Sequence, residues 1–98
     1  MQPIRAANLL PEGMTKVEKT VRATLVDVLG ISAERAADFT ATTPLFGALP
    51  ELDSMAVAGV LTELEDRLAI VIEDDEVDGD MLETFGSLVE FAVRKALV

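Results

Sequence analysis

The sequence contains no histidine and no cysteine, and it also lacks tryptophan and tyrosine. Ser-His and Cys-His nucleophilic catalysis, the usual zinc sites, disulfides and iron–sulfur ligation are therefore excluded. A lysine could activate a serine instead, but Lys16, Lys19 and Lys95 are far along the chain from Ser54, the serine of interest below, and are expected on other helices. We therefore expect a protein that is not an enzyme.

Basic residues are scarce, with 8 lysines and arginines against 18 acids and a formal net charge of −10. This balance argues against nucleic acid or an anionic membrane as a partner and favours basic protein surfaces. Residues 51–83 hold twelve acids and the single base Arg67, a net charge of −11. Such a run is either a solvated face or a docking surface. So acidic a surface repels copies of itself, and we expect a monomer.

Long apolar runs are also missing. No stretch reaches the length of a membrane span, and residues 1–13 lack the apolar stretch of a signal peptide, so we expect a cytoplasmic protein. Ninety-eight residues, half of them hydrophobic, fit one domain with a modest core. Pro3, Pro11 and Gly13 without periodicity predict a flexible leader over residues 1–13, followed by a helical domain over residues 14–98.

Apolar residues recur at helical spacing in three segments. Thr15 and Glu18 form a capping-box pattern that opens a first helix ending at Gly30. A second helix is predicted from Ser54 to Leu68, and Thr84 is predicted to cap a third, with Arg94 and Lys95 at its C-terminal dipole. The expected inward residues are Val17, Val21, Leu25, Val28, Leu29, Val57, Val60, Leu61, Leu64, Leu68, Phe85, Leu88, Val89, Ala92, Val93 and Ala96.

The segments between these helices are expected to be irregular but held in place. Ser32 can cap a short helix over residues 33–37, and apolar residues can pin the rest of the long loop to the bundle: Phe39, Leu45, Phe46, Leu49 and Leu52. Residues 69–72 have no strand to pair with, so we expect a connector whose Ile70 and Ile72 enter the core. A short helical turn is predicted near residues 78–83. The fold class is all-α, a small four-helix bundle with three long helices, one short helix and a long loop between helices one and two.

Ser54 is the strongest candidate for function, because the segment 49–55 ends the long loop and opens a helix at this serine. Backbone N–H groups and the positive end of the helix dipole favour an anion there. We therefore hypothesise that Ser54 is esterified by a phosphate-linked prosthetic group. The alternative is purely structural, because Asp and Ser are both preferred at helix N-caps.

The order of these features resembles acyl carrier proteins and related carrier domains over residues 15–97. The family's Asp-Ser-Leu motif corresponds to Asp53-Ser54-Met55, which keeps the acid and the serine and places methionine third. The later segment Thr84-Phe85-Gly86, which opens the last helix, matches as well.

The resemblance implies that Ser54 accepts a 4′-phosphopantetheine arm from coenzyme A through a separate phosphopantetheinyl transferase, with Asp53 and Met55 flanking the cofactor. The thiol of the arm would carry acyl intermediates as thioesters in a fatty-acid, polyketide or related pathway. The absence of cysteine is then no obstacle, because the cofactor brings the sulfur. The implied partners are the transferase and acyl-loading, acyl-transfer or condensing enzymes with basic docking surfaces.

Family members commonly bind partners through the start of helix two, where acids often follow the serine. Ala56 and Gly59 stand at such places here, so acids further along are expected to steer the encounter. Gly59 either allows close approach of a partner or is tolerated on a surface. The predicted partner surface comprises Ala58, Gly59, Thr62, Glu63, Glu65, Asp66, Ile72 and Asp74. Leu61, Leu64, Phe46, Ile72 and Leu88 could line an acyl groove or belong to the core.

Two other functions stay open from the residues alone. Asp74, Glu76, Asp78 and Gly79 occupy positions one, three, five and six of an EF-hand-like loop over residues 74–85, but Phe85 stands where a bidentate glutamate is required. Weak calcium binding is therefore conceivable, and no dedicated metal site is predicted. The other alternative is an acidic helical adaptor that binds proteins without a covalent cofactor.

Overall fold

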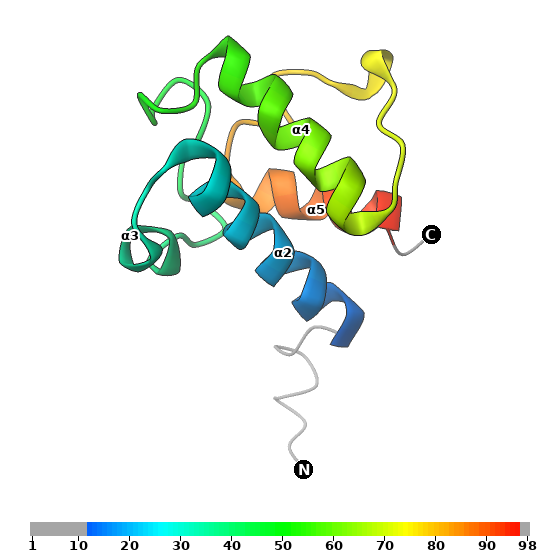
Figure 1. The fold of residues 1–98 in the computed structure, drawn as a ribbon, viewed down its shortest axis with the longest axis horizontal. Helices are drawn as coiled ribbons and strands as arrows, with labels where there is room; N and C mark the ends of the chain where they lie inside the picture. Colours follow the sequence, from blue (N-terminus) through cyan, green and yellow to red (C-terminus); the bar gives the residue numbers. More distant parts are fainter. Residues whose placement is uncertain (1–11, 97–98) are drawn as a thin grey trace.

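Helices make up all the regular secondary structure in residues 12–96, the part of the chain that the computed structural model describes. They are α2 (Glu12–Leu29), α3 (Ala33–Ala37), α4 (Ser54–Leu68) and α5 (Phe85–Ala96), with the 3₁₀ helix η1 (Asp74–Glu76) between α4 and α5. α2 packs against α3, α4 and α5 (Figure 1). The predicted all-α bundle of three long helices and one short one is confirmed.

The first helix begins earlier than its capping pattern predicts. α2 starts at Glu12, so Thr15 and Glu18 lie within the helix and do not cap it. Glu12 and Gly13 belong to the helix, whereas residues 1–11 of the expected leader lie outside the described residues. Gly30 ends the helix at φ +72°, as predicted. Among the described residues, no helix combines the length and apolar character needed to cross a membrane.

The core draws on the four α-helices and on the loops between them. The predicted inward residues of the three long helices are all buried or packed against the core. Buried residues that the helical spacing does not predict include Met81, Leu82 and Phe91. Phe91 lies at the edge of the predicted apolar stripe of α5 and lines a hollow together with residues of the 76–81 segment. This segment covers part of α5 beside the stripe, and the buried face of the helix is therefore wider than its apolar spacing predicts.

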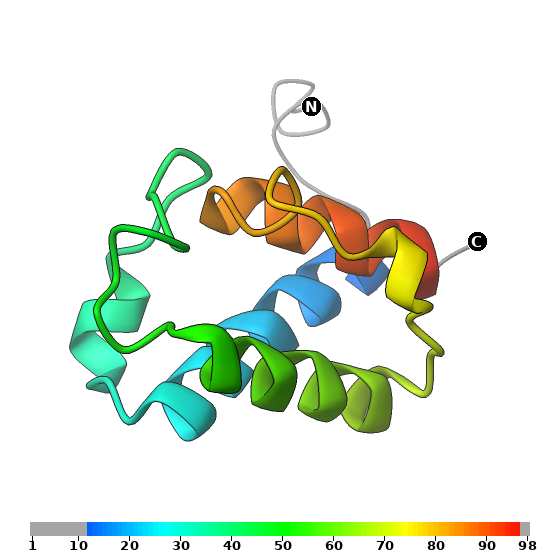
Figure 2. The ribbon, with the colours of Figure 1, turned by 90° about the horizontal axis from the view of Figure 1, so that it is seen from above.

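The long loop before α4 is held against the start of α5. The N–H groups of Leu45 and Phe46 donate to the carbonyls of Glu83 and Leu82 at 2.8 and 3.0 Å, and Phe85 N–H donates to Thr43 O at 2.8 Å. Figure 2 shows this loop at one end of the bundle and η1 at the other. Side chains that pin the loop, as predicted, are Phe39, Leu45, Leu49 and Leu52.

The prediction that Phe46 also pins this loop is wrong, because its side chain is 46% exposed. Its backbone pairs with Leu82 while the adjacent Leu45 is fully buried. Phe46 opens the turn 46–48, which the N–H groups of Ala48 and Leu49 close on Leu45 O, so Leu45 stays in the core while Phe46 lies on the outside of the turn.

The connector after α4 contains no strand, as predicted, and Ile72 packs against the core. Ile70, which is expected to enter the core as well, is only partly buried and lies outside the core cluster. The chain turns sharply just before it, because Ala69 adopts the left-handed conformation at φ 54° and Ile70 N–H still donates to Glu65 O. The end of α4 therefore fixes the backbone of Ile70 and leaves Ile72 as the side chain that reaches the core.

The helical turn expected at residues 78–83 is instead η1, several residues earlier. Glu73 and Glu76 cap η1 reciprocally, with Glu73 N–H donating to Glu76 Oε1 at 2.9 Å. Residues 79–83 form turns and a bend instead of a helix, with Asp78 Oδ1 accepting from Met81 N–H at 2.9 Å and Glu83 N–H donating to Asp80 O at 3.3 Å.

Candidate attachment site

Ser54 is the first residue of α4, where the long loop meets the helix (Figure 1). Its side chain is exposed. Within the described residues its hydroxyl makes no hydrogen bond to the protein. The hydroxyl is therefore accessible to a reagent or enzyme from solution, without a local bond to break.

Asp53 fixes the start of α4 as its N-cap. Asp53 Oδ1 accepts a hydrogen bond from Ala56 N–H at 2.8 Å, and its carbonyl accepts from Val57 N–H at 2.9 Å. Capping of this kind stabilises a helix by about 1 kcal/mol. Asp53, which is predicted to flank the cofactor, therefore has a structural role as the helix cap. By fixing the start of α4, it sets the position of the Ser54 hydroxyl.

The start of α4 can accommodate an attached anion. The first turn contains no acidic residue, and the N–H groups of Ser54 and Met55 have no acceptor among the described residues. Free N–H groups at a helix start carry partial positive charge and favour anions. A phosphate ester on Ser54 fits this chemistry.

The other two serines of the sequence are engaged in helix caps. Ser32 Oγ accepts from Arg35 N–H at 3.0 Å at the start of α3. Ser87 Oγ accepts from Thr84 N–H at 3.0 Å and contacts the carbonyls of Met81 and Thr84 at 3.0 and 2.9 Å. Ser54 is thus the serine whose hydroxyl is exposed and without a bond inside the described part of the chain.

The segment leading to Ser54 is anchored by burial and by an ion pair. Leu52 is 3% exposed and donates its N–H to Leu49 O at 3.0 Å. Glu51 binds the guanidinium of Arg35 through both carboxylate oxygens, at 2.6 and 3.3 Å, which ties the loop to α3. The guanidinium of Arg35 lowers the pKa of the Glu51 carboxyl from its usual value.

Four residues line the outer face of α4 beside the attachment point. Met55 is 85% exposed, and the side chains of Ala58, Thr62 and Asp66 are exposed as well. Their spacing of three and four residues places them on one stripe of the helix. Ala58, Thr62 and Asp66 are the part of the predicted partner surface on α4 that is free to make contacts, and Met55, which is predicted beside the cofactor, extends them to the stripe Met55–Ala58–Thr62–Asp66.

Gly59 belongs to the predicted partner surface, and the structure places it against α2. A Cβ built on Gly59 would lie 3.3 Å from Val28 Cγ1. The close approach that this glycine allows in the structure is therefore between α4 and α2 of the same chain. Packing of α4 on α2 is thus sufficient to explain a glycine at this position, and its contact with a partner stays a prediction.

Glu63 and Glu65, also predicted to contact partners, have partners within the chain. Glu63 Oε1 accepts from Arg67 Nε at 3.0 Å, and Arg67 reaches Asp27 of α2 at 2.7 Å. Glu65 Oε2 accepts from Ile72 N–H at 2.8 Å. Both carboxylates help to hold α4 and the connector in place.

The acids after α4 carry the EF-hand-like pattern. Asp74 is exposed at the start of η1, whereas Glu76 binds Lys95 Nζ at 2.9 and 3.0 Å. Among the described residues, no group of three or more acids, histidines or cysteines has the geometry of a metal site. The second ligand position of the EF-hand-like pattern is thus engaged by a cation of the chain itself.

The predicted acyl groove divides into core and surface residues. Leu64 and Leu88 are fully buried, Leu61 and Ile72 are partly buried against the core, and Phe46 is exposed on the loop. Leu64 and Leu88 therefore belong to the core, and Phe46 belongs to the surface.

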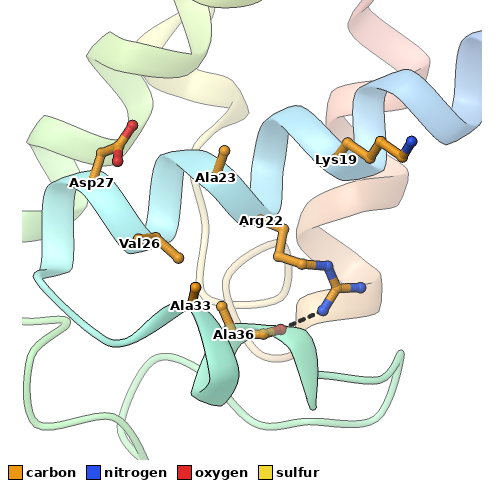
Figure 3. A pocket seen from close by; sticks show the side chains of 7 residues that line it. All are labelled: Lys19, Arg22, Ala23, Val26, Asp27, Ala33 and Ala36. Carbon is orange, nitrogen blue, oxygen red and sulfur yellow. Dashed lines mark hydrogen bonds between the residues drawn. The ribbon is translucent and has the colours of Figure 1, made fainter.

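Of two hollows on the surface, one includes Ser54 in its lining and the other does not. One, of about 500 Å³, is formed by residues 46–50 with Leu52, Asp53 and Ser54 itself. The other, of about 300 Å³, lies between α2 and α3 and is shown in Figure 3, where Arg22 donates to Ala36 O. None of the predicted site residues lines the second hollow.

Two features next to Ser54 are not predicted from the sequence. Phe46 is expected in the core because it is apolar, and no local pattern distinguishes it from Leu45. The Arg35–Glu51 pair joins residues sixteen positions apart, so no helical spacing indicates it.

Comparison with known proteins places the chain in a family. A protein family described as a phosphopantetheine attachment site matches residues 19–92. The solution structure of a holo acyl carrier protein from Nitrosomonas europaea is 44% identical and superposes with a TM-score of 0.71, covering 80% of this chain and 92% of that one. No curated protein sequence matches the chain.

Proposed function

We propose that Ser54 bears the phosphopantetheine group of this chain, which belongs to the phosphopantetheine-attachment family of acyl carrier proteins. The observation that carries this assignment is the exposed Ser54 hydroxyl without a hydrogen bond in the described chain, compared with the engaged hydroxyls of Ser32 and Ser87. The matched region includes all three serines, so geometry is needed to choose among them.

The chain acts as a carrier rather than as a catalyst. The group supplies a thiol that holds an acyl chain as a thioester. No base lies within hydrogen-bond distance of the Ser54 hydroxyl in the described residues, so a separate transferase has to activate it. Enzymes of a fatty-acid, polyketide or related pathway then exchange acyl groups with the carrier.

We further propose that partners dock on the stripe Met55–Ala58–Thr62–Asp66. An apolar start and an acidic end fit a partner surface with an apolar pocket and a basic rim. Ile72 and Asp74 extend this surface beyond the helix. The acids of the 51–83 segment would steer basic partners toward it.

The first test is loading in vitro. The chain is incubated with coenzyme A and a broad-specificity phosphopantetheinyl transferase and then weighed. We expect the wild type to gain one phosphopantetheine group and Ser54→Ala to gain none. Ser32→Ala is the matched control, because it removes another exposed helix-start serine, and it should load like the wild type. Loading of Ser54→Ala would contradict the assignment.

A further inference from the structure

The hollow beside Ser54 lies where a group bonded to that serine must begin. It is an open hollow of about 500 Å³, lined by residues 46–50, Leu52, Asp53 and Ser54 itself. We propose that this hollow holds the phosphopantetheine arm against the carrier when no partner enzyme is bound. The proposal rests on Ser54 being the attachment residue.

The walls of the hollow are fixed before the arm arrives. Ala48 and Leu49 donate their N–H groups to Leu45 O at 3.0 and 2.8 Å. Phe46 is held by its bond to Leu82 O, and Glu51, which lies between the lining residues Pro50 and Leu52 in sequence, is held by its pair with Arg35. A preformed surface costs little conformational entropy when a ligand settles on it.

The lining also suits the chemistry of the arm. Pantetheine alternates amide groups with methyl and methylene groups, so it needs apolar contacts beside accessible backbone. Phe46, Leu49 and Pro50 provide apolar surface on the loop, and Phe46 is 46% exposed. Packing in the core does not account for this exposed aromatic side chain, and contact with the arm would.

The charges around the hollow are compatible with a phosphate at its edge. Glu51, the acid nearest to the loop wall in sequence, is paired with Arg35, and the Asp53 carboxylate accepts from Ala56 N–H. The phosphate would stay at the free N–H groups of α4, and the uncharged part of the arm would extend toward Phe46.

The test compares the chain before and after loading by NMR, after mass spectrometry has confirmed one group on Ser54. An aromatic ring shifts the resonances of nearby protons. We expect the paired methyl protons of the arm to be displaced from their position in free 4′-phosphopantetheine, with contacts to the Phe46 ring. The amide resonances of residues 46–49 should move as well.

Phe46→Leu is the decisive variant, because it removes the ring and keeps an apolar side chain. It should abolish the methyl displacement and leave loading intact. Val71→Ala is the matched control, since Val71 is 65% exposed and does not line the hollow. Unchanged amide spectra elsewhere show that both variants fold.

Two results would overturn the proposal. Methyl resonances at their free positions in the wild type would mean that the arm is in solution. If the loaded Phe46→Leu variant reacts more slowly with a partner enzyme but its arm resonances match those of the wild type, Phe46 contacts the partner and not the arm. Failure of loading at Ser54 is seen first in the mass and would overturn the proposed function itself.

Discussion

At the level of single residues, Gly86 sets how closely the long loop approaches α5. Its N–H donates to Ala41 O at 2.9 Å, and a Cβ at this position would lie 2.6 Å from the same oxygen. Any side chain therefore has to push the backbone of the loop away. Because the loop ends at Ser54, this contact bears on the attachment site as well as on stability.

Gly86→Ala should lower the free energy of unfolding by about 1–3 kcal/mol, as expected for overpacking against backbone. Gly79→Ala is the control, because a Cβ there meets nothing within 4 Å. Denaturant unfolding of the two variants measures the difference. Equal stability of Gly86→Ala and the wild type would show that the loop can move away freely.

The sequence predicts where Ser54 lies but not why its hydroxyl is free. Asp53 and the helical spacing after it indicate a helix start at this serine. The bonds that engage Ser87 involve Met81 O, which belongs to a turn whose form the sequence does not specify. Hydroxyl partners depend on such contacts, so the comparison among serines needs the structure.

At the level of elements, the long helices follow their apolar spacing closely, whereas the connections depend on long-range partners. α4 has the predicted bounds, because Asp53 caps it and its apolar stripe ends at Leu68. η1 forms where Glu76 can bind Lys95 of α5, nineteen residues later. Local propensity contains no information about that pair.

Glu76 predicts how the connector responds to acid. The bond from Glu73 N–H and the ammonium of Lys95 lower the pKa of Glu76 from its usual 4.5. A carboxyl with a lowered folded-state pKa stabilises the native state above its unfolded pKa, and this contribution is lost as the pH falls through the folded-state value.

Glu76→Gln should therefore lose less stability than the wild type when the pH is lowered below 4.5. Thermal unfolding measured over a pH series checks this, with Asp75→Asn as the control for removing a neighbouring exposed acid. Parallel pH profiles for wild type and Glu76→Gln would mean that the pair with Lys95 does not contribute.

At the level of the whole molecule, the net charge of −10 is concentrated in the part of the sequence that contains the attachment site and α4. Long-range attraction of a basic partner by such a surface raises the association rate and is screened by salt. Asp66, the acid of α4 without an ion pair or hydrogen bond to the described residues, is the one expected to contribute.

Asp66→Lys should slow loading by the transferase roughly two- to tenfold at low salt and less at high salt. Glu34→Lys on α3 makes the same change in net charge away from α4 and is the matched control. Initial rates at several salt concentrations distinguish the two. If the effect of Asp66→Lys did not depend on salt, or if both variants had equal effects, electrostatic steering by α4 would be contradicted.

The most direct measurement of the central claim is peptide mass spectrometry of the protein isolated from the cells that make it. The peptide containing Ser54 should carry phosphopantetheine, free or acylated, while the peptides with Ser32 and Ser87 remain unmodified. A preparation in which the group is found on another residue, or in which the Ser54 peptide is always unmodified, would contradict the carrier function proposed for Ser54.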